Sequence, residues 1–148
     1  MGLAVDQVII SLDKSYLSDV EALLQKCELP YQDCNEHLDK FFGISSGGKL
    51  VAIGALQVKG TIALLRSIAV PPENRGLGLA AAMTQHLLGV ARSNEVSELY
   101  LLTETAEAYF TRFGFYPVVR DRVPAEIKST RQFESLCPSS AQIMRLDL

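Results

Sequence analysis

Short apolar runs alternate with longer amphipathic stretches along the chain, and the two patterns predict different elements. Runs rich in branched and aromatic residues are typical of β-strands, so we expect strands at 5–12, 41–45, 50–58, 61–70, 98–103, 115–119 and 142–146. Apolar residues at helical spacing predict helices from Ser15 or Ser18 to about Cys27 and at 36–40, 78–92 and 106–113, with one helical turn in 125–130.

The connections between these elements favour antiparallel neighbours. Ser46-Gly47-Gly48-Lys49 and Lys59-Gly60 are sequences typical of tight turns. Together the elements predict an α/β (α+β) fold with a central mixed, mostly antiparallel sheet of six or seven strands flanked by helices. The tail beyond residue 119 mixes both charge signs, and its simplest interpretation is a covering loop that completes the sheet edge.

Composition narrows the class of protein. A chain of 148 residues with 48% hydrophobic residues suits one domain with a single core, residues 1–148. A net charge of −3 without a basic block argues against nucleic acid as a partner. No apolar run reaches the roughly 18 residues of a membrane helix, and no secretory signal is evident. Three cysteines do not form a disulfide framework, so we expect a reducing cytoplasm and no metal site.

The stretch 67–83 carries the clearest chemical signal. A strand is stopped by Pro71-Pro72, and Arg75, Gly76 and Gly78 then open an alanine- and leucine-rich helix. The unpaired N–H groups of a helix N-terminus bind anions, and glycines let phosphates approach the main chain. The intervening residues disfavour a dinucleotide fingerprint, and no Gly-Lys-Ser/Thr follows for a P-loop. The remaining alternative is tight packing of helix on strand.

This stretch resembles the acetyl-CoA signature of the GCN5-related N-acetyltransferases (GNAT). Arg75, Gly78 and Ala80 occupy the signature positions after a strand that ends in Val70-Pro71-Pro72. The later Arg112-Phe113-Gly114-Phe115 resembles the second landmark of that family, a helix-to-strand turn. The resemblance implies the GNAT fold, acetyl transfer to an amine, and acetyl-CoA as co-substrate.

The resemblance also implies roles for individual residues. Backbone N–H groups for the CoA pyrophosphate would come from Gly76, Leu77, Gly78, Leu79 and Ala80, beside Arg75. The pantetheine arm would pair with the strand end at Ile68, Ala69 and Val70, with Phe110 beside the cofactor. The thioester carbonyl would be bound by the main-chain N–H of Ile68.

The proton donor has several candidates in the sequence. Many relatives use a tyrosine as general acid, and its usual position holds Phe110 here, which has no proton to donate. Tyr109 substitutes through a shifted helix, or water or substrate protonates the thiolate, or Tyr109 is a packing residue. Thr103 and Glu104, at a strand end, are candidates for contacting the acceptor. Glu104 is equally a solvated loop charge or a helix cap.

Arg66 in the central strand has two interpretations. An arginine inside a sheet needs a countercharge or an open cavity, because desolvating a bare guanidinium is costly. It is either the partner of an internal aspartate or glutamate, or the anchor for a substrate carboxylate.

A closer resemblance concerns the acceptor. The tail, residues 65–70 and residues 98–106 are similar to bacterial arsenic-resistance N-acetyltransferases, and the Leu-Thr-x-x-Ala and Val-Pro pattern is similar to amino-acid N-acetyltransferases that act on glutamate. Both imply a small amine with an α-amino-acid end, such as an amino acid or a glutamate-like organoarsenical. Homodimers are common in the superfamily. Two alternatives stay open: a CoA-binding sensor that lacks catalysis, and an acetyltransferase of protein termini or lysines.

Overall fold

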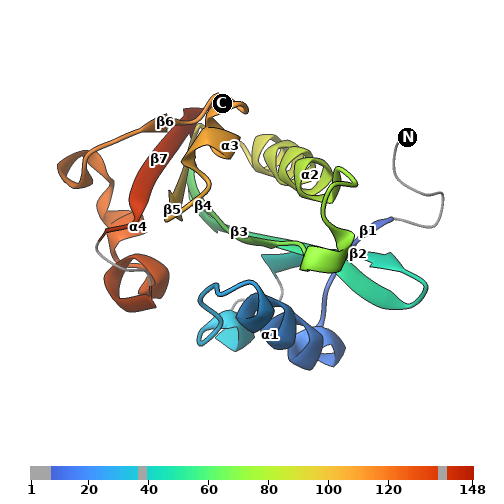
Figure 1. Cartoon of the computed structure of the whole chain (residues 1–148). Helices are drawn as coiled ribbons and strands as arrows, with labels where there is room; N and C mark the ends of the chain where they lie inside the picture. The colour runs from blue at the N-terminus through green and yellow to red at the C-terminus, as the bar shows by residue number, and fades with distance from the viewer. Residues whose placement is uncertain (1–7, 37–39, 137–139) are drawn as a thin grey trace.

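The computed structural model describes residues 8–36, 40–136 and 140–148. A seven-stranded sheet forms its centre, in the order β1-β2-β3-β4-β5-β7-β6 (Figure 1). The strands are β1 (Ile9–Ser11), β2 (Phe41–Ser46), β3 (Lys49–Lys59), β4 (Ile62–Ala69), β5 (Glu98–Thr103), β6 (Tyr116–Pro117) and β7 (Gln142–Asp147). Among the strands of the described residues, only β4 and β5 pair in parallel, which confirms a mixed, mostly antiparallel sheet.

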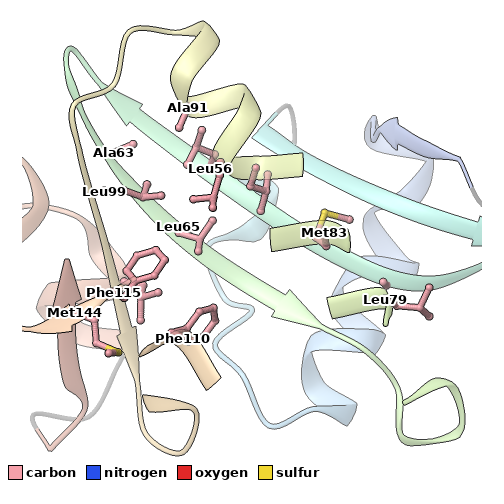
Figure 2. Close-up of a cluster of buried hydrophobic side chains, with 14 of the residues drawn as sticks. Leu56, Ala63, Leu65, Leu79, Met83, Ala91, Leu99, Phe110, Phe115 and Met144 are labelled. Carbon is pink, nitrogen blue, oxygen red and sulfur yellow. The ribbon is translucent and has the colours of Figure 1, made fainter. Parts of the chain in front are cut away.

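Helices cover both faces of the sheet. On one face lie α1 (Leu17–Lys26) and the short α4 (Ala125–Lys128), and on the other lie α2 (Leu79–Ser93) and α3 (Glu107–Thr111) (Figure 1). A π-helical turn, Gln132–Leu136, follows α4. The α2 face holds the largest core cluster, in which Leu65 and Leu99 of the sheet meet Met83 of α2 and Phe110 of α3 (Figure 2).

The central strands separate part of the way along their length. Parallel pairing of β4 with β5 ends at Leu64 and Tyr100, so the rest of β4 has no strand beside it on that edge. On its other edge β4 bulges, because Ile53 faces Ala69 while Ala55 faces Arg66. Ser67 lies in the bulge with a φ of 62°, a left-handed conformation that is uncommon for serine. The result is a wedge between β4 and β5 whose wall includes unpaired main chain.

Several elements differ from the sequence-based expectations. Asp13, not Ser15 or Ser18, caps the first helical segment, because its Oδ1 accepts from the Ser15 N–H at 3.0 Å. The expected helix at 36–40 is a 3₁₀ turn at Cys34–Glu36, and residues 37–39 lie outside the described residues, as does the start of the first expected strand. The final strand does not complete the edge: β7 lies between β5 and β6, and β6 is the edge.

Close contact between α2 and β3 depends on Gly54. A Cβ built there would lie 2.7 Å from Met83 Cγ and 2.9 Å from Leu87 Cδ1, well inside contact distance. We expect Gly54→Ala to lower the free energy of unfolding by about 1–3 kcal/mol through overpacking, measured by urea denaturation. Gly89→Ala in α2 is the matched control, since a Cβ there meets nothing within 4 Å. It should be neutral or stabilising by up to about 1 kcal/mol, and an equal loss in both variants would contradict the packing argument.

Candidate functional site

The N-terminus of α2 is built to expose main-chain donors. Gly76 and Gly78 adopt φ values of 84° and 79°, and Gly78 occupies the cap position without a capping side chain. The first helical hydrogen bond runs from Ala82 N–H to the Gly78 carbonyl. The N–H groups before Ala82 therefore have no helical partner, and the helix dipole favours negative charge beside them.

These donors open onto a groove of about 300 Å³. Its walls are Val70, Asn74, Arg75, Gly76, Gly78, Leu79, Ala80, Ala81, Tyr109 and Arg112. Arg75 is held in place because its Nε donates to the Val70 carbonyl at 2.9 Å. Arg112 adds a second guanidinium, 5.6 Å from the centre of the Tyr109 ring. An uncapped helix end with two arginines is a site for phosphate groups. The sequence interpretation placed Arg112 in the turn motif and missed its place in this groove.

A larger cleft of about 1070 Å³ fills the wedge between β4 and β5. One wall is 65–70 of β4 and its exit, and the facing wall is 102–106 at the end of β5. Residues 27–32 after α1, together with Gln132 and Ala141 from the C-terminal segment, also line it. The cleft and the groove share four lining residues, Val70, Arg75, Ala80 and Tyr109, so the two form one continuous channel.

The bulge in β4 lies in the wall of this cleft. Ser67, Ile68, Ala69 and Val70 all line it, and the register places Ser67 and Ile68 together opposite Gly54. A bulge leaves main-chain groups unpaired, and no strand covers the β5-facing edge here. The predicted N–H donor at Ile68 therefore sits in a segment whose backbone can bind a ligand oxygen. Nothing in the sequence indicated the left-handed Ser67.

Tyr109 and Phe110 have different surroundings. Phe110 belongs to the α2-face core cluster and makes an edge-to-face contact with Phe115 at 5.8 Å, although it also touches the cleft. Tyr109 lines both the groove and the cleft, and its hydroxyl is buried without a hydrogen-bond partner that satisfies normal geometry. Burial raises the pKa of the Tyr109 phenol, an effect that the nearby Thr84 hydroxyl and the charge of Arg112 partly offset. Of the two tyrosines among the described channel-lining residues, Tyr31 and Tyr109, only Tyr109 lines both the groove and the cleft, and its raised pKa favours the protonated phenol.

Arg66 lies in an internal ion pair, the first of its two interpretations. Its two terminal nitrogens donate to the two carboxylate oxygens of Asp33, each at 2.6 Å, and both side chains are at most 1% exposed. Its Nε donates to the Ser67 hydroxyl at 3.1 Å, so the same guanidinium braces the bulge. Asp33 lies between α1 and β2, and no local pattern in the sequence identified it as the partner.

The remaining candidates are spread around the cleft. Thr103 and Glu104 both line it, and the Thr103 hydroxyl also accepts from the Ala106 N–H at 2.9 Å, so it closes the turn that leads into α3. Cys27 lines the cleft, whereas Cys34 is buried and burial raises its pKa to about 11. In the part of the chain that the structure describes, no group of three histidine, cysteine or acidic residues could hold a metal ion, and His37 and Cys137 lie outside it.

Comparison with known protein families and with individual proteins points to the same family. Residues 9–115 match the acetyltransferase (GNAT) family. The amino-acid acetyltransferase of Mycobacterium tuberculosis is 34% identical over 93 residues, which are 62% of this chain and 50% of that protein. The match thus spans about half the length of that relative.

Solved structures match nearly the whole chain. One from Mycobacterium tuberculosis, in complex with CoA and a ligand designated NLQ, is 25% identical with a TM-score of 0.78, covering 95% of this chain and 99% of that one. N-acetylglutamate synthase from Neisseria gonorrhoeae, complexed with coenzyme A and N-acetyl-glutamate, is 18% identical with a TM-score of 0.82, covering 95% of this chain and 35% of that one. At that identity the second likeness concerns the fold.

No helix among the described residues is long and apolar enough to span a bilayer.

Proposed function

The chain belongs to the acetyltransferase (GNAT) family, and from this premise we propose that it acetylates the amine of a small, amino-acid-like acceptor. It is an N-acetyltransferase, and acetyl-CoA is its co-substrate. One observation carries the proposal for the site: the uncapped N-terminus of α2 opens on a groove that continues into the cleft between β4 and β5. We further propose that residues 1–148 act as one domain.

Each part of the channel is proposed to bind a different part of acetyl-CoA. Acetyl-CoA supplies an activated acetyl thioester. The free N–H groups at 76–81, with Arg75 and Arg112, bind its phosphates. The unpaired edge at Ile68, Ala69 and Val70 holds the pantetheine arm, and the N–H of Ile68 stabilises negative charge on the thioester oxygen. Tyr109, beside both spaces, donates a proton to the departing sulfur.

The acceptor class rests on the relatives and on the shape of the cleft. The relative is an amino-acid acetyltransferase, and the cleft is lined by the short segments 27–32 and 102–106. Thr103 and Glu104 line its acceptor end, where we propose that they contact the amine. A glutamate-like organoarsenical carries the same α-amino-acid end and belongs in the same substrate panel. Arg66, committed to Asp33, holds the wall of the cleft in place.

Two measurements on one sample test the proposal. Calorimetric titration with acetyl-CoA should show binding, and release of CoA thiol should then be followed with a panel of amino acids, organoarsenicals and peptides. Turnover confined to small α-amino acids or their analogues would support the proposal. Binding without turnover on any amine would favour the CoA-binding sensor, and turnover only on peptides would favour a protein acetyltransferase. No binding would contradict the site itself.

Tyr109→Phe tests the proton donor. We expect kcat to fall about 100-fold while the dissociation constant of acetyl-CoA stays within about twofold, because only the hydroxyl is lost. The raised pKa of Tyr109 keeps the phenol protonated beyond its ordinary range, so the alkaline loss of kcat due to this group should lie at higher pH than for an ordinary tyrosine and be missing in the variant. Tyr116→Phe is the control, since the Tyr116 hydroxyl bonds Asp147 outside the channel. An unchanged kcat in Tyr109→Phe would assign the proton to water or substrate.

A further inference from the structure

Ser67 has a backbone conformation that serine rarely adopts. Its φ of 62° lies in the left-handed region, where a Cβ is unfavourable and glycine is the usual residue. Two other described residues besides glycine have a positive φ, Glu28 and Glu95. Each of these follows the end of a helix, where left-handed residues are common. Ser67 instead lies inside the strand β4, so its conformation needs a compensating contact.

The hydroxyl of Ser67 makes such a contact with its neighbour. Arg66 Nε donates to Ser67 Oγ at 3.1 Å. Successive side chains of a regular strand point to opposite faces of the sheet, so sequence neighbours do not normally meet. These two meet because the bulge turns Ser67 out of the regular pattern. The hydrogen bond would break in an extended strand, and it therefore favours the bulged conformation.

The arginine that holds Ser67 is itself fixed. Its two terminal nitrogens donate to the carboxylate of Asp33, at 2.6 Å each, and both side chains are almost fully buried. Asp33 is held in turn, because the next residue, Cys34, is fully buried in the core cluster under α1. A chain of contacts thus runs from outside the sheet, through Arg66, to the left-handed residue of β4.

The conformation of Ser67 decides where the next N–H points. The peptide group after Ser67 is planar and carries the N–H of Ile68, so rotation of the Ser67 backbone turns that N–H with it. Ser67 and Ile68 both line the cleft, on an edge of β4 that has no strand beside it. A donor stabilises developing charge best when it is already aimed before the reaction.

We propose that Ser67 is a positioning residue for acetyl transfer. Its hydroxyl, held by the Arg66–Asp33 pair, keeps the bulge in place and so aims the N–H of Ile68 at the thioester oxygen. This rests on the proposed function, in which Ile68 is that donor. The hydroxyl acts through the backbone and not on the substrate. Transfer therefore needs a left-handed residue at position 67, and glycine adopts that conformation without the hydrogen bond, whereas alanine does not readily do so.

The test compares Ser67→Ala and Ser67→Gly with the wild type. Ser67→Ala loses the hydrogen bond and keeps the Cβ, so we expect kcat to fall about 10-fold, less than the roughly 100-fold expected when an oxyanion donor is removed. Ser67→Gly should keep kcat within about threefold of the wild type. In both variants KM for the acceptor and the dissociation constant of acetyl-CoA should stay within about twofold, because no substrate contact is removed.

Glu95 provides the matched control. It has a φ of 60°, follows α2 and lines neither the groove nor the cleft. Glu95→Ala and Glu95→Gly repeat the two changes at a left-handed residue outside the channel. They should leave kcat unchanged, and Glu95→Gly should be at least as stable as Glu95→Ala in urea denaturation. A fall in kcat in these controls would attribute the effect at position 67 to general loss of stability and would overturn the inference.

The remaining outcomes separate the inference from the proposed function. Unchanged kcat in Ser67→Ala, with an active wild type, would overturn the inference and leave the proposed function standing. Loss of kcat in Ser67→Gly would overturn it as well, whether or not Ser67→Ala folds, because the oxygen itself would then be required. A rise in KM alone would make Ser67 an acceptor contact instead. A wild type that binds acetyl-CoA but acetylates no amine would overturn both.

Discussion

Replacing Arg66 with alanine is expected to lower the free energy of unfolding by about 3–5 kcal/mol, because the Asp33 carboxylate is then buried without its countercharge. The pair is bidentate, with both distances 2.6 Å and both side chains almost fully buried. A typical domain is stable by only about 5–15 kcal/mol, so this one change removes a large share of the total. Urea denaturation followed by circular dichroism measures it.

Two further variants separate charge from packing. In Arg66→Met/Asp33→Leu both charges are gone, and stability should recover much of the loss, because no ion is left unpaired. Lys26→Met breaks an exposed pair with Glu73, with side chains 50% and 51% exposed, and should change stability little. If Arg66→Ala instead keeps its stability and loses only acceptor use, the guanidinium binds the acceptor directly and the structural role of the pair is wrong.

Gly78→Val is expected to weaken acetyl-CoA binding by more than about 100-fold. A Cβ at Gly78 meets no protein atom within 4 Å, so the space that a valine side chain would fill is the open groove. In the proposed site the phosphates reach the free N–H groups of α2 through that space, and a branched side chain there would block the approach. Calorimetric titration with acetyl-CoA measures the loss.

Backbone strain must be separated from this steric effect. Gly78 has a φ of 79°, where valine is strained by about 1–3 kcal/mol whatever surrounds it. Gly60→Val is the matched control: Gly60 has a φ of 67°, also meets nothing within 4 Å, and lies in the turn between β3 and β4, away from the channel. Both variants should lose similar stability, and only Gly78→Val should lose affinity. Unchanged affinity in Gly78→Val would mean that the phosphates bind elsewhere.

Local patterns were sufficient for most elements. The strand expected at 98–103 is β5 (Glu98–Thr103), and the helix expected at 78–92 is α2 (Leu79–Ser93). Both segments have strong apolar periodicity, and Gly78 and the polar residues after Arg92 mark the two ends of the helix. Local propensity and tertiary packing therefore favour the same elements. The glycine-led helix start was visible for the same reason, since Gly76 and Gly78 do occupy left-handed conformations.

Contacts between distant segments could not be inferred in this way. Asp33 and Arg66 are 33 residues apart, and the sequence offers many other acidic residues as partners. The insertion of β7 between β5 and β6 depends on which strand edge is free after the others have paired. The orientation of Tyr109 toward the channel depends on how α3 packs, and its neighbour Phe110 takes the core position.

The sequence by itself determined a mixed sheet and a helix N-terminus opened by Gly76 and Gly78, and it predicted an anion site beside Arg75. These features are set within a few residues of one another by backbone conformation and periodicity. Only the tertiary structure decided the composition of the proposed acceptor cleft, because its walls come from 27–32, from both central strands and from Gln132. Burial makes Arg66 pair with Asp33 and leaves the Gln132 oxygen without a partner. Such pairings depend on which polar groups are removed from water next to one another, and that depends on the tertiary structure.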